Sequence, residues 1–118
     1  MKTVVMMLSS GQEIIGNMKP NVEDAKFYYL EFPQSIKWWR EKDRGQCYEF
    51  VPFIYGANMQ TNIPIRKIHV IAMSVANTDI IQAYNRLVDE VLVHMERMVG
   101  LKRHLDDEGA TLEIKKGL

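Results

Sequence analysis

Short apolar runs separated by polar turns fill the first two-thirds of the chain. Runs that are typical of strands lie at 4–8, 13–19, 27–32 with a continuation to 39, 48–55 and 63–73. The last run contains "IPIRKIHVIAM", which predicts a strand end, a tight turn and another strand. Short sequential strands with short connections favour antiparallel pairing in a small barrel or a strongly bent sheet.

From Ile80 to Met98 the apolar residues recur at spacings of three and four, the period of an amphipathic helix. Asn77-Thr78-Asp79 supplies N-cap side chains and an acidic first turn. We expect Gly100 to end the helix and the polar remainder to be a loosely ordered tail.

The sequence therefore predicts three parts: a β-barrel at 1–76, a helix at 77–100 packed on the same domain, and a polar tail at 101–118. The apolar face of the helix leaves two interpretations open. It packs on its own or a neighbour's barrel, or it serves partner binding or a helix bundle.

Gly16 lies inside the second predicted strand, five residues after the turn glycine Gly11. A glycine in a strand lowers stability, so it is usually kept for a sharp bend or a close backbone approach. We expect Gly16 to let this strand bend hard enough to serve both halves of a barrel. Pro33 lacks an N–H donor and indicates an edge position or a bulge.

Composition narrows the class of protein. The 118 residues predict one domain, and 15 basic against 15 acidic residues give a net charge of zero. A broad basic face for nucleic acid is thereby excluded, so any such contact is local. Cys47 is the single cysteine, which permits no internal disulfide and fits a cytoplasmic setting. The apolar runs are too short to span a bilayer, so no membrane partner is expected.

Catalytic chemistry finds no support in the residue pattern. The histidines at 69, 94 and 104 have no recurring metal-ligand spacing, and Gly11 to Gly16 opens a strand where a phosphate loop would open a helix. We expect no enzymatic activity, no catalytic residue, no metal and no cofactor.

Two stretches carry a resemblance to the Sm/Lsm family, which includes the Hfq-type proteins. Gly11 to Met18, with Leu30 near its end, resembles the first Sm motif, and Ile65 to Val70 resembles the second. The resemblance covers residues 3 to 74, and the overall layout is similar to small Sm-like proteins with a C-terminal helix among tailed phages. It implies a mainly β fold: a small five-stranded, strongly bent antiparallel Sm-like barrel followed by one C-terminal α-helix.

The same resemblance implies a function. Sm-like subunits pair edge strands head-to-tail into a cyclic homo-oligomer and bind single-stranded RNA through loops that face the pore. In this sequence the corresponding residues are Asn21, Asp24, Lys26, Arg66, Lys67 and His69. Two of them depart from the family pattern, because Lys26 stands where an Asn is expected and Lys67 replaces a Gly.

These departures keep an alternative open: the ring is a structural or protein-interaction module, with unknown protein partners, that does not bind RNA. In either case we expect a cytoplasmic protein, in the host cytoplasm if a phage encodes it. The stretch "KWWR" adds Trp38 and Trp39, which alternation places on opposite faces of a strand. They serve base stacking, or the core or a subunit contact.

Overall fold

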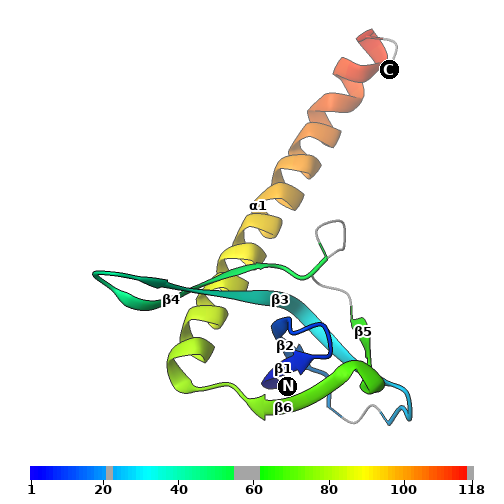
Figure 1. Cartoon of the computed structure of the whole chain (residues 1–118). Coiled ribbons are helices and arrows are strands. Elements are labelled where there is room, and N and C mark those ends of the chain that lie inside the picture. The colour runs from blue at the N-terminus through cyan, green and yellow to red at the C-terminus, as the bar shows by residue number, and fades with distance from the viewer. Residues whose placement is uncertain (21–22, 55–61, 117–118) are drawn as a thin grey trace. The chain divides into compact units, whose positions relative to one another are not determined.

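The computed structural model describes residues 1–20, 23–54 and 62–116, with side chains described up to Met98. Its elements are β1 (Lys2–Leu8), β2 (Glu13–Met18), β3 (Phe27–Glu41), β4 (Gly45–Pro52), β5 (Ile63–Arg66), the 3₁₀ turn η1 (Lys67–His69), β6 (Val70–Val75) and α1 (Thr78–Lys116) (Figure 1). The chain forms two compact units, Met1–Ile81 and Gln82–Leu118.

The six strands form one bent antiparallel sheet. Its order is β4-β3-β2-β1-β6, and β5 pairs with the first part of β3. A mainly β fold with a bent antiparallel sheet followed by one helix is therefore confirmed. The sheet is not closed, because no pairing joins β6 to β4 or β5 among the described strands.

Strand β3 changes partners along its length. Phe27 to Leu30 pair with β5, whereas Gln34 to Glu41 pair with β4 in a long hairpin (Figure 1). Between these parts the register to β2 shifts: Ile15 faces Gln34 and Asn17 faces Glu31, so β3 contains one extra residue. This is a β-bulge, and bulges bend and twist a strand.

The bulge falls opposite Gly16, but the extra residue belongs to β3 and not to β2. Phe32 carries it with a φ of 50°, and the buried Pro33 follows, as its missing N–H suggested. Gly16 itself does not have a positive φ. A Cβ there would lie 3.1 Å from both Cβ and Cδ1 of Leu30, so Gly16 serves the close approach of the two strands.

The main core cluster lies on the face to which Val4, Met6 and Leu8 of β1 point. Ile15, which points to the opposite face from Ile14 in β2, is fully buried too. Residues that point inward alternate along β1 and belong to the main cluster. The partly buried Tyr28 and Phe53 pack against the cluster. Its buried members are Val4, Met6, Leu8, Ile14, Leu30, Ile63 and Ile65.

Helix α1 begins as the sequence indicates. The Asn77 side chain accepts a hydrogen bond from the N–H of Ile80 at 2.9 Å, which caps the first turn. The predicted end at Gly100 and the predicted polar tail at 101–118 are wrong, because α1 continues to Lys116. A glycine inside a helix costs only about 1 kcal/mol relative to alanine, and the strong helix formers around Gly100 and Gly109 offset it.

Candidate functional site

Two segments far apart in the sequence meet beside the first residues of β3. They are the loop before β3 and the β5–η1 junction. Phe27 pairs with Arg66 in the β3–β5 register, and the N–H of Lys67 donates a hydrogen bond to the Lys26 carbonyl at 2.9 Å. The structure thus brings together four predicted residues, Asp24, Lys26, Arg66 and Lys67. We call these segments and the side chains around them the two-loop site.

Asp24 organises the loop from within. Its Oδ1 accepts hydrogen bonds from the N–H of Lys26 at 2.8 Å and of Phe27 at 3.1 Å. Its Oδ2 accepts one from the Tyr29 hydroxyl at 2.9 Å. The backbone bond from Lys26 first, and then the Tyr29 hydroxyl, hold the pKa of Asp24 below its ordinary value. The same carboxylate raises the pKa of Tyr29.

The two cations of the β5–η1 junction lie over aromatic rings. Lys67 Nζ is 4.9 Å from the centroid of the Tyr28 ring, and Arg66 Cζ is 5.8 Å from that of Phe27. Both are within the range of cation–π attraction. Within the described part of the chain neither side chain forms an ion pair with a carboxylate. Both side chains can therefore contact an anionic ligand, and the Lys67 ammonium also lies near enough to Asp24 to contribute to its lowered pKa.

A hollow of about 210 Å³ opens between these segments. Phe27 and Tyr29 line it with ring centroids 6.3 Å apart and planes tilted by 44°. The other lining residues are Met18, Lys19, Pro20, Tyr28 and Lys67. Half-buried aromatic rings can stack a base, and the neighbouring cations can contact its phosphate.

Sequence reasoning included neither Lys19 nor the aromatic residues Phe27 to Tyr29 among the site residues. Lys19 is held beside β3 by its N–H, which donates to the Tyr29 carbonyl at 3.2 Å. Its position directly before Pro20, at the end of the second predicted strand, is the signal that could have placed it on the same loop.

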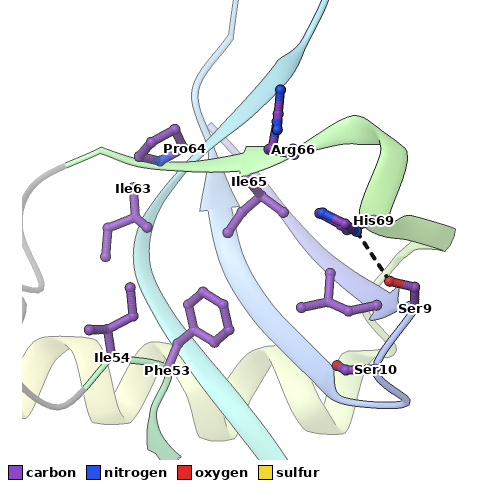
Figure 2. A pocket seen from close by; sticks show the side chains of 10 residues that line it. Ser9, Ser10, Phe53, Ile54, Ile63, Pro64, Ile65, Arg66 and His69 are labelled. Carbon is purple, nitrogen blue, oxygen red and sulfur yellow. Dashed lines mark hydrogen bonds between the residues drawn. The ribbon is translucent and has the colours of Figure 1, made fainter.

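The predicted His69 lies apart from this hollow. Its Nδ1 is 3.3 Å from Ser9 Oγ, and its carbonyl accepts the N–H of Ser9 at 2.7 Å. It lines a second hollow of about 600 Å³, whose walls are mostly apolar. In Figure 2 Ile63, Ile65 and Phe53 point into this second hollow, while Arg66 points away from them. The predicted Asn21 lies outside the described residues.

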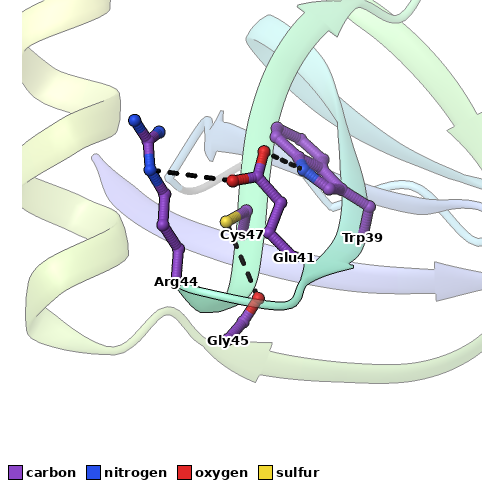
Figure 3. Close-up of polar contacts among 5 residues, drawn as sticks. All are labelled: Trp39, Glu41, Arg44, Gly45 and Cys47. Atoms are coloured by element: carbon purple, nitrogen blue, oxygen red, sulfur yellow. Dashed lines mark hydrogen bonds and ion pairs between the residues drawn. The ribbon is translucent and has the colours of Figure 1, made fainter.

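The tryptophans of "KWWR" lie on the β3–β4 hairpin and neither is a core residue. Trp38 and Trp39 are 41% and 40% exposed. Trp38 Nε1 donates to Glu13 at 3.2 Å, and Trp39 Nε1 donates to Glu41 at 3.1 Å. Glu41 also pairs with Arg44 at 3.6 Å, close to the Cys47 thiol that contacts the Gly45 carbonyl (Figure 3). The contacts of Trp39, Glu41, Arg44 and Cys47 lie at the end of the hairpin, and the Trp38 bond to Glu13 joins the hairpin to β2.

The described residues contain no group of three His, Cys, Asp or Glu side chains that could hold a metal ion. Nor does any helix in that part of the chain have the length and apolar character needed to cross a bilayer.

Fold and site define the class: a bent, open antiparallel β-sheet domain with a C-terminal helix and a local basic–aromatic site. No protein-family model and no curated protein matches the sequence. The resemblance to the Sm/Lsm family accordingly remains a prediction from the two motifs.

Proposed function

We propose that the protein is an Sm-like subunit that assembles into a homo-oligomeric ring and binds single-stranded RNA at the two-loop site. The observation that carries this proposal is the hydrogen bond from Lys67 to Lys26, which joins the segments of the two motifs. Lys19 and Lys67 line the adjacent hollow together with the aromatic run Phe27 to Tyr29, and Arg66 lies over the Phe27 ring.

The chemistry of the two-loop site favours single-stranded RNA over a duplex. Stacking on an aromatic side chain contributes about 1–3 kcal/mol per base and needs a base that is free of a duplex. The lysine and arginine groups suit the phosphates that link such bases. Because the whole chain has no net charge, repetition of a small basic site around a ring is the arrangement that would strengthen binding.

The open edge of the sheet supports assembly. Strand β6 has no second neighbour among the described strands, and its Ile71, Met73 and Val75 are 66%, 41% and 57% exposed. An apolar edge strand is a template for pairing with another chain. Pairing of β6 with the β4–β5 edge of a second copy would cover it and would repeat head-to-tail into a ring.

The second candidate function is the same ring as a structural or protein-interaction module without RNA. The net charge of zero and the substituted motif positions Lys26 and Lys67 favour it. Both candidate functions use the β6 edge for assembly, but only the first assigns RNA to the two-loop site.

Fluorescence anisotropy with labelled U-rich and A-rich single-stranded RNA tests the first candidate. The variant Arg66→Ala/Lys67→Ala should bind at least ~10-fold more weakly and show a shallower dependence on salt, because it neutralises fewer phosphates and so releases fewer counterions on binding. Lys37→Ala/Arg40→Ala removes the same charge from the β3–β4 hairpin and should bind like the wild type. If the wild type and the Arg66/Lys67 variant bind RNA equally, the two-loop site is not an RNA site, and the second candidate function remains.

A further inference from the structure

Helix α1 is longer than the β domain can cover. Its 39 residues make a rod of about 58 Å at 1.5 Å per residue. A compact unit of the size of Met1–Ile81 has a radius of gyration of about 12 Å and is therefore about 30 Å across. Whatever the placement of the two units, close to half of the helix extends beyond any surface that this domain can offer.

The apolar pattern nevertheless continues along the whole helix. Five apolar residues follow one another at a spacing of seven: Tyr84, Val91, Met98, Leu105 and Leu112. The positions three residues after the first four of these hold Leu87, His94, Leu101 and Glu108. This is a heptad repeat with one fully apolar seam and a second seam that contains two polar residues.

The repeat of seven has a specific structural meaning. In a straight helix, residues seven apart drift by about 20° per repeat, so a stripe of this kind stays in contact only with a partner that coils with it. A flat sheet surface would favour a repeat at 3.6 residues per turn, which a constant spacing of seven does not follow. The pattern therefore indicates a second helix as the partner of α1, beyond its first turns.

An isolated helix of this composition would also be only marginally stable in water, because most helical stability in proteins comes from packing of an apolar face. Met98, on the apolar seam, is 52% exposed in the single chain. A partner that covers it would supply the missing burial.

We infer that the distal part of α1 associates with α1 of other copies of this chain, in a parallel, in-register helical bundle. The inference rests on the proposed ring for its geometry, because cyclic symmetry directs every copy's helix to the same side and places identical residues at the same height and distance from the axis. A polar core position such as His94 can set the register of a bundle at some cost in stability, and Glu108 on the same seam would add like-charge repulsion where the copies meet.

Cysteine cross-linking of the full-length protein tests this inference. The background carries Cys47→Ser, which removes the single native thiol. Met98→Cys places a thiol on the apolar seam, and Val93→Cys places one on a face outside both seams, where the native side chain is 44% exposed. Mild oxidation should give at least ~10-fold more covalent dimer from Met98→Cys than from Val93→Cys, as read on a non-reducing gel.

Light scattering of the same samples separates this inference from the proposed ring. A ring mass with selective cross-linking at position 98 supports both. A ring mass with equal cross-linking at the two positions, or with none at 98, overturns the helix contact and leaves the ring intact. A monomer–dimer mass with selective cross-linking at 98 supports the helix contact and overturns the ring. Circular dichroism at 222 nm verifies that each variant keeps the helix content of the wild type.

Discussion

Gly16 illustrates how one residue sets the distance between two strands. The Leu30 side chain occupies the space that a Cβ at position 16 would need, at 3.1 Å, a separation tighter than ordinary van der Waals contact. The glycine is thus required by its neighbour on β3 and not by its own backbone angles.

Gly16→Ala should therefore destabilise the protein by about 1–3 kcal/mol, as overpacking does. The expectation is specific because replacing a strand glycine by alanine would otherwise stabilise by about 0.4–1 kcal/mol through the unfolded chain. Urea unfolding measures the effect. Ala72→Val, an enlargement at an exposed strand position, should stay within about 0.5 kcal/mol of the wild type. A Gly16→Ala protein as stable as the wild type would contradict this account of the contact.

Asp24 is the second residue whose role follows from its contacts. Its pKa is lowered by the N–H of Lys26 and the hydroxyl of Tyr29, so the ionised form is stabilised in the folded state. A depressed folded-state pKa contributes stability that is present above the unfolded value, 3.8, and is lost as the pH falls through the folded-state pKa.

Asp24→Asn should lower the denaturation midpoint at neutral pH, and the difference from the wild type should shrink as the pH falls from 3.8 downward. Midpoints measured across this range provide the check. Asp43→Asn, in the exposed turn between β3 and β4, is the control for loss of one surface carboxylate. If the denaturation midpoints of Asp24→Asn and the wild type differ by the same amount at every pH, the effect comes from the altered side-chain shape and hydrogen bonding and not from the charge of Asp24.

At the scale of elements, β6 has the most unusual environment of the strands. It pairs with β1 on one side only, and most of its residues are exposed on both faces. Native edge strands are usually protected by charge, proline or a covering segment. An apolar, uncovered edge strand is typical of a surface that another chain pairs with.

Ile71→Lys/Val75→Lys should reduce the oligomer mass in light scattering, because charges on an edge strand oppose pairing with a second chain. Ile68→Lys is the matched control. It removes an apolar side chain that is 75% exposed but lies in η1, outside the strands, and it should leave the mass unchanged. If both variants dissociate alike, loss of apolar surface and not strand pairing is responsible. If the wild type has the mass of a monomer, the proposed ring is wrong.

At the scale of the whole molecule, charge is balanced globally but not locally. Fifteen basic and fifteen acidic residues cancel, yet three basic side chains, Lys19, Arg66 and Lys67, gather around the aromatic run Phe27 to Tyr29. An RNA ligand would therefore be attracted at short range only, since exposed charges are screened beyond about 8–10 Å at physiological salt. A ring with a bundle of helices on one side would combine such a site with a separate assembly device.

The elements were predictable where the signal is local. Alternation of Val4, Met6 and Leu8 specifies a half-buried strand, and the Asn77 side chain marks the start of α1 at its first turn. The helix end was mispredicted because Gly100 is a frequent stop signal whose cost is small enough for the surrounding helix formers to offset.

The candidate site was predictable in part. The motif positions Arg66 and Lys67 and the loop residue Lys26 are neighbours in space, as expected. The aromatic lining was not found, because nothing in a strand-like run tells which rings face a loop and which face the core. Lys19 was missed although its place directly before Pro20 marks the loop. His69 lies apart from the two-loop site, because its ring faces Ser9.

The sequence by itself determined the kind of each element, since side-chain periodicity and capping act over a few residues. It also determined the heptad seam of α1, which is a matter of spacing alone. Only the tertiary structure decided that the extra residue of the bulge belongs to β3, that β3 exchanges β5 for β4 as its partner, and that β6 is left as an open edge. Those outcomes depend on contacts between residues far apart in the chain, where the packing of Leu30 against Gly16 and the reach of each strand, and not local preference, select the register.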